Sequence, residues 1–115
     1  YAAIAALKNG KANTEYMKTE YNMRRKLIVE ELNKMGYDCF APLGAFYVFP
    51  SIKKFSFTSE EFCEKLLFEE KLAVVPGNAF GDCGEGYIRI SYAYSQENIK
   101  KALDRRARFA EKYRK

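Results

Sequence analysis

The segment from Gly86 to Ala93 reads GYIRISYA, and it decides the fold class of the chain. Its side chains alternate between two faces, with the period of two that a β-strand imposes. One face is apolar and the other carries the polar groups. The apolar face consists of Ile88, Ile90 and Tyr92. The other face consists of Tyr87, Arg89 and Ser91. A strand with one apolar face needs other elements packed against it, and the flanking sequence supplies them.

Four helices are predicted around this strand, over residues 1–7 and 15–35, after Thr58 and after Ser95. Gly10 breaks the first helix, as a glycine beyond a helix end does. Thr14 is predicted to cap the second helix with its side chain. Thr58 and Glu61 form the capping-box pattern of the third helix. The apolar positions of the last helix are Ile99, Ala102, Leu103, and Phe109 or Ala110.

Two more strands are predicted from short apolar runs. Residues 45–49 (AFYVF) are rich in aromatic and branched side chains, and residues 72–75 (LAVV) end at Pro76-Gly77. The element order is predicted to be ααββαβ-loop-βα, or close to it, with two strands, one of them residues 45–49, between the second and third helices. It predicts an α+β (α/β) fold with a small antiparallel or mixed sheet of about three to four strands, covered by helices.

Length and composition limit the class of protein. The 115 residues, 48% of them apolar, suit one domain with its own core. No apolar run reaches the length of a membrane-spanning helix. Cys39, Cys63 and Cys83 are odd in number and widely spaced, so we expect reduced thiols in a cytoplasmic protein and no metal site. The chain opens at Tyr1 inside a predicted helix, from which we expect a fragment of a longer protein.

The net charge of +5 allows two interpretations. Much of the excess lies in residues 105–115, where it could contact nucleic acid or could complement the dipole at the end of a helix. The second interpretation is favoured. Residues 44–49 (GAFYVF) are similar to the aromatic strand of an RNA-recognition motif, but that fold begins with a strand, and here two helices come first.

Arg89 is the most informative polar residue. Its planar fork suits a carboxylate, which it can bind with two parallel hydrogen bonds. Taken alone, the strand pattern also allows a structural ion pair or a solvated face. The loop of residues 76–86 (PGNAFGDCGEG) could hold a phosphate, but it matches no phosphate-binding motif and is more typical of a plain connection.

Four stretches taken in order are more specific than any one of them. They are residues 21–25 (YNMRR), 42–50 (PLGAFYVFP), 74–81 (VVPGNAFG) and 86–93 (GYIRISYA). Together they resemble the final segment of class I aminotransferases of the aspartate and aromatic type, which are fold-type I pyridoxal-phosphate (PLP) enzymes. The resemblance covers essentially the whole chain. It implies that residues 1–12 end a large-domain or interdomain helix and that residues 13–115 form the small C-terminal domain.

The resemblance also implies site residues. Arg89 occupies the position that binds the α-carboxylate of the substrate in this family. Gly44 and Ala45 are expected beside the substrate, where their small size leaves room. An active-site loop is expected from Pro76, Gly77, Phe80 and Gly81.

For the full-length protein the resemblance implies transfer of an amino group between an amino acid and a 2-oxo acid, in amino-acid metabolism or biosynthesis. It implies PLP held mainly by the upstream part, which also carries the Schiff-base lysine, and a homodimer. This chain alone is then expected to be inactive, without nucleic-acid or membrane partners. Relatives that are PLP lyases, decarboxylases or transcription regulators stay open as alternatives, and the sequence does not name the amino acid.

Overall fold

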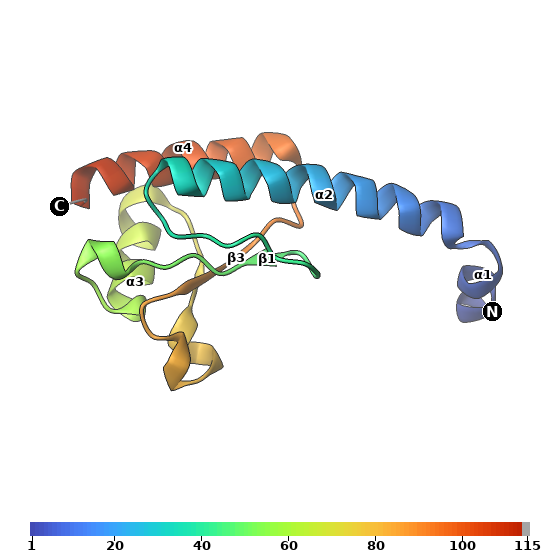
Figure 1. Cartoon of the computed structure of the whole chain (residues 1–115), viewed down its shortest axis with the longest axis horizontal. Coiled ribbons are helices and arrows are strands. Elements are labelled where there is room, and N and C mark those ends of the chain that lie inside the picture. Colours follow the sequence, from blue (N-terminus) through green and yellow to red (C-terminus); the bar gives the residue numbers. More distant parts are fainter. Residues whose placement is uncertain (114–115) are drawn as a thin grey trace.

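The computed structural model describes residues 1–113 of the chain. Its helices and strands, with three short 3-10 turns, follow in the order α1 (Ala2–Asn9), α2 (Lys11–Lys34), β1 (Tyr47–Val48), η1 (Lys53–Phe55), α3 (Ser59–Glu70), β2 (Val75–Pro76), η2 (Gly77–Phe80), η3 (Asp82–Gly84), β3 (Ile88–Ser91) and α4 (Gln96–Tyr113). In Figure 1, α2 and α4 run along one side of the sheet, and α1 lies at the far end of α2. The α+β class is confirmed.

The sheet has three antiparallel strands in the order β1-β3-β2. The central strand is therefore β3, which carries Arg89. Val48 pairs with Ile90 on one side of it, and Val75 pairs with Arg89 on the other. The prediction of two strands between the second and third helices was wrong. Only β1 forms there in the described chain, together with isolated bridges at Ser51.

The predicted start of α2 was also wrong. The helix begins at Lys11, and its N-cap is Gly10 without a side-chain cap. Thr14 lies inside the first turn, where its hydroxyl donates a 3.1 Å hydrogen bond to the Gly10 carbonyl oxygen. Threonine in a helix can bond the carbonyl four residues earlier instead of capping, and it does so here. The domain boundary near residue 12 stays a prediction.

The other two helix starts agree with the sequence. The Thr58 hydroxyl accepts a hydrogen bond from the Glu61 amide, and the Glu61 carboxylate accepts one from the Thr58 amide. The ring centroids of Phe57 and Phe62 lie 6.5 Å apart, as expected of a hydrophobic staple. The Ser95 hydroxyl accepts from the Asn98 amide at the start of α4. Local side-chain chemistry thus fixes where α3 and α4 begin.

The core lies between the sheet and the helices α2, α3 and α4. Its most buried apolar members include Ile28, Leu32, Val48, Ile52, Phe62, Leu66, Ile88, Tyr92, Ile99, Leu103 and Phe109. One cation is buried among them. The Arg106 side chain is 2% exposed, and its guanidinium carbon lies 4.4 Å from the centroid of the Tyr37 ring. No hydrogen-bond partner within residues 1–113 reaches any of its three nitrogens.

The basic residues of α4 bind the acidic end of α3. Arg108 pairs with Glu70 at 2.7 Å, and Lys112 pairs with Glu69 at 2.7 Å. These contacts give part of the C-terminal charge an intramolecular partner. Lys112 also lies in the last turn of α4, where the favoured helix-dipole interpretation needs a basic residue. Residues 114 and 115, which belong to the same basic stretch, lie outside the described part. Within residues 1–113 no helix is both long and apolar enough to cross a membrane.

Candidate substrate-carboxylate site

Arg89 lies in the middle of the central strand, on the face opposite the buried Ile88. Its guanidinium carbon is 4.5 Å from the centroid of the Tyr47 ring and 4.8 Å from that of the Phe80 ring. Tyr47 comes from β1, and Phe80 ends the 3-10 turn η2. Within residues 1–113 the guanidinium has no ion-pair or hydrogen-bond partner. The structural ion pair that the strand pattern allowed is therefore absent from the described chain.

This arrangement leaves the hydrogen-bonding capacity of Arg89 unused. All five N–H groups of a guanidinium lie in its plane, while aromatic rings interact with its flat face. The two rings therefore contact the cation without consuming a donor. The side chain is partly buried, so an anion that binds its edge is also partly shielded from water. A carboxylate matches this fork with two parallel charge-assisted hydrogen bonds.

The glycine-rich loop is closed upon itself. A Cβ added to Gly77 would overlap the carbonyl oxygen of Gly84, and a Cβ added to Gly84 would overlap that of Gly77. Gly81 has a φ of +116°, which side-chain-bearing residues rarely adopt. Three hydrogen bonds join the loop to α3. The Ser59 hydroxyl accepts from the Gly86 amide, Glu85 accepts from the Ser59 amide, and the Asn78 side chain donates to Glu60. The close approach of Gly77 and Gly84 therefore draws the two ends of the loop together.

The predicted loop residues divide into two groups. Pro76 extends β2 opposite Ile88, and the Gly77 amide donates a 2.9 Å hydrogen bond to the Tyr87 carbonyl oxygen, so both belong to the sheet edge. Phe80 and Gly81 are exposed at the tip of the loop. The structure therefore places Phe80 against Arg89. Pro76 and Gly77 instead join the start of the loop to β3.

Gly44 and Ala45 lie on the exposed segment before β1. The Ala45 carbonyl oxygen accepts a 3.0 Å hydrogen bond from the Tyr92 hydroxyl, which ties this segment to the end of β3. Ala45, and not Gly44, has the left-handed backbone, with a φ of 58°. A Cβ added to Gly44 would meet nothing within 4 Å. The described chain thus gives no packing reason for a glycine there, and the role of both residues beside a substrate stays a prediction.

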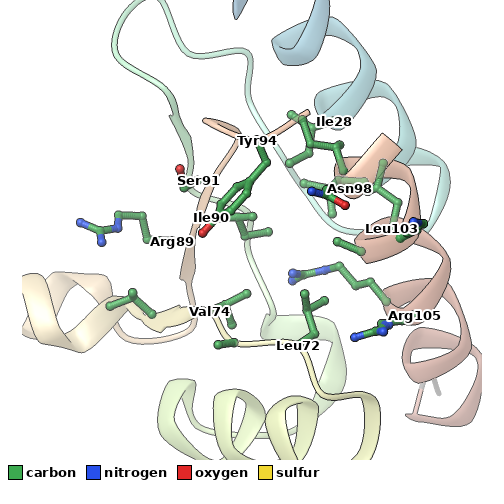
Figure 2. A pocket seen from close by; sticks show the side chains of 17 residues that line it. Ile28, Leu72, Val74, Arg89, Ile90, Ser91, Tyr94, Asn98, Leu103 and Arg105 are labelled. Atoms are coloured by element: carbon green, nitrogen blue, oxygen red, sulfur yellow. The ribbon is translucent and has the colours of Figure 1, made fainter. Parts of the chain in front are cut away.

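A separate cavity of about 530 Å³ lies between β3, the segment before β2, and helices α2 and α4. Ile90, Leu72 and Leu103 contribute apolar walls, and Arg105 lies at its margin. Arg89 contributes to the wall, but Figure 2 shows its guanidinium directed away from Leu103 and Arg105. The guanidinium of Arg89 therefore points away from the part of the cavity that Leu103 and Arg105 line.

Tyr47 is the site residue that the sequence pattern did not identify. It was assigned to a strand, but contact with Arg89 depends on the register between β1 and β3. Because Tyr47 pairs with Ser91, it is a diagonal neighbour of Arg89 on the same face. Metal ligands form no comparable cluster in the described chain, since no three His, Cys, Asp or Glu side chains gather within residues 1–113.

Comparisons with known proteins identify the family of the chain. The family described as aminotransferase class I and II matches residues 1–105. YugH of Bacillus subtilis, named as an aminotransferase, is 54% identical over 112 residues, which are 97% of this chain and 29% of YugH. An aspartate aminotransferase of Pyrococcus abyssi is 51% identical over 107 residues, which are 91% of this chain and 28% of that protein.

A solved structure shows the same fold. The aromatic aminotransferase of Pyrococcus horikoshii superposes with a TM-score of 0.93 at 46% identity, over 97% of this chain and 30% of that one. The chain thus spans less than a third of the length of these relatives. By the family match and the shared fold, the chain belongs to the class I and II aminotransferases.

Proposed function

We propose that the full-length protein is a PLP-dependent aminotransferase and that this chain is its C-terminal substrate-clamping domain. Membership of the family supports the reaction class. The chain matches less than a third of the length of each of these relatives, which supports its being one domain of a longer protein. In this proposal the protein moves an amino group between an amino acid and a 2-oxo acid. The relatives named for aspartate and aromatic substrates make these amino acids the first to test.

The observation that carries the proposal is the free edge of Arg89. The guanidinium would donate two parallel N–H hydrogen bonds to the α-carboxylate of the amino acid. This contact would fix the direction of the substrate's Cα–H bond relative to the catalytic groups of the intact protein. Holding a reactant in one orientation removes part of the entropic barrier, and small misplacements reduce the rate strongly. Arg89 would thus contribute binding and orientation, without taking part in proton transfer.

We propose that PLP is held mainly by the part of the protein outside this chain. The ends of the glycine-rich loop approach each other closely at Gly77 and Gly84, and the interactions around Arg89 are aromatic. In the proposal the rest of the polypeptide therefore holds the cofactor and supplies the Schiff-base lysine. When bound, PLP acts as the electron sink for chemistry at the amino acid Cα. The chain alone is accordingly proposed to be inactive.

The proposal extends to the setting of the intact protein. We place it in the cytoplasm as a homodimer that functions in amino-acid metabolism or biosynthesis. The three free cysteines support a reducing compartment, since paired cysteines are typical of oxidising ones. Sedimentation of the intact protein and fractionation of the source cells test these two points.

The test is an Arg89→Lys variant of the intact protein. Lysine keeps the charge but loses the fork, so we expect kcat/KM for the amino acid to fall at least about tenfold while the PLP absorbance is retained. Arg108→Lys, which changes an exposed ion pair on α4, is the matched control. An unchanged kcat/KM in Arg89→Lys would refute the assignment of Arg89.

The product identifies the reaction class. A PLP band that shifts with an amino acid, together with the matching 2-oxo acid, supports transamination. A shift accompanied by a different product indicates a PLP lyase or decarboxylase. A protein that stays colourless and unresponsive with added PLP would overturn the proposal and leave a regulatory role for the same fold.

A further inference from the structure

We infer that Tyr47 and Phe80 form an aromatic clamp that positions the Arg89 guanidinium for its carboxylate. The inference rests on the proposed function and adds two positioning residues to it. Both rings lie within 4.8 Å of the guanidinium carbon, measured to their centroids. They come from different segments, β1 and η2, so the fold itself brings the clamp together.

Each ring of the clamp has aromatic support. The centroid of the Phe46 ring lies 4.6 Å from that of Tyr47. Phe80 packs edge-on against Phe49 at 6.0 Å, and Phe49 stacks on Tyr87 at 5.9 Å. The two rings thus belong to two aromatic groups, Tyr47 with Phe46 and Phe80 with Phe49 and Tyr87, which meet at Arg89. Ring-to-ring packing of this kind restrains each of the two rings more than a contact with Arg89 alone would.

The backbone beneath Phe80 is also restrained. The interlocked Gly77 and Gly84 define the base of the loop, and Ser59, which is fully buried, links that base to α3. Phe80 itself is 51% exposed. The loop therefore holds the ring in place while leaving space beside it, which is what a site that admits a small anion requires.

The clamp restricts the motion of the Arg89 side chain, which is long and flexible. Without restraint its fork samples many rotamers, and a ligand must select one of them at an entropic cost. The two rings beside the guanidinium restrict these rotamers, and no hydrogen bond within residues 1–113 occupies its N–H groups. The rings also displace water from their side of the guanidinium, which strengthens attraction between the cation and a carboxylate. We therefore expect the clamp to act on substrate affinity through Arg89.

The experiment uses the intact parent protein with its PLP. Tyr47→Leu and Phe80→Leu remove a ring while keeping apolar bulk, and Tyr47→Phe and Phe80→Tyr keep a ring. Phe68→Leu, which removes a ring that is 71% exposed on α3, is the control. The readouts are kcat and KM for the amino acid substrate, and competitive inhibition by succinate and by 3-phenylpropionate, which carry a carboxylate and no amino group.

We expect each leucine variant to raise KM and the inhibition constants roughly 2- to 30-fold, the range of a cation–π contact, with a smaller change in kcat. The ring-keeping variants should recover most of this loss, which also shows that the leucine effect is not misfolding. In an Arg89→Lys background the leucine substitutions should add little, because the guanidinium that they position is gone.

The outcomes distinguish a failure of the clamp from a failure of the proposed carboxylate site. If Arg89→Lys weakens carboxylate binding but the leucine variants do not, the clamp is wrong and the carboxylate site stands. If the leucine variants cost the same with arginine and with lysine at position 89, the rings act on general structure and the inference is overturned. If Arg89→Lys itself changes nothing, the proposed role of Arg89 fails and the clamp fails with it.

Discussion

Replacing Arg106 by methionine should stabilise the chain. The side chain is 2% exposed, and its Nε, Nη1 and Nη2 atoms have no hydrogen-bond partner within residues 1–113. The Tyr37 hydroxyl lies nearby but outside hydrogen-bonding geometry, and the contact with that residue is to the ring. Burial lowers the pKa of the guanidinium, and the charge interaction with Tyr37 opposes this shift. Arginine nevertheless stays charged at neutral pH, so a full charge is buried.

The expected gain follows from two opposing contributions. Three buried nitrogens without partners cost about 1 kcal/mol or more each. The contacts with the Tyr37 and Phe62 rings return about 1–2 kcal/mol in total. Methionine keeps a similar length and fills irregular space. The net gain is then about 1–2 kcal/mol, within the range measured for replacing buried ionic groups by apolar ones, and roughly 5 °C in Tm.

Urea and thermal unfolding of the 115-residue chain measure this gain. Arg105→Met is the matched control, one position away on the same helix. Arg105 donates to the Glu70 and Lys71 carbonyl oxygens at the end of α3, so its loss should destabilise by about 1 kcal/mol. The two neighbouring substitutions should therefore have opposite signs. A fall in stability for Arg106→Met as large as that for Arg105→Met would refute the account of an unpaired buried charge.

Three further predictions concern local features. Thr58→Ala removes one half of the capping box of α3 and should cost about 1 kcal/mol in urea unfolding, and a loss below about 0.3 kcal/mol would contradict the role of the cap. Exposed Cys83 should be alkylated by iodoacetamide at pH 8 well before the two buried thiols, whose pKa burial raises to about 11; equal rates by mass spectrometry would contradict this. Hydrogen bonds from Lys112 and Tyr113 lower the pKa of Glu69 below 4.5, so Glu69→Gln should destabilise at pH 7 and converge with the parent chain as the pH falls through that lowered pKa. A difference that is independent of pH would show that the charge of Glu69 is irrelevant.

Local signals made much of the fold predictable. The period of two along β3, the capping box at Thr58 and the cap at Ser95 each depend on neighbours within a few residues, and the structure confirms all three. The start of α2 was missed for a similarly local reason. Gly10 continues the helical backbone with a φ of −78°, so the chain needs no side-chain cap at that point. A sequence pattern shows that Thr14 can cap a helix, but not that it bonds backward instead.

The features that escaped prediction depend on distant parts of the chain. The contact of Tyr47 with Arg89 follows from strand register, and no short-range pattern fixes that register. The burial of Arg106 was available from spacing, because it lies three residues after the buried Leu103. The charge of Arg106 argued against a core position. The structure shows that its place on the buried face of α4 decides its burial despite that charge. Arg89 itself was found because the resemblance to a family added to the pattern.

The interlocked pair Gly77 and Gly84 also determines how this loop can be varied in directed evolution. Any side chain at either position would collide with the opposite carbonyl group, so randomising these two codons yields mostly unfolded clones. Ala79, Asp82 and Cys83 between them are exposed and free to change. A library restricted to those three codons would alter the rim of the arginine site while each clone keeps the loop that carries Phe80.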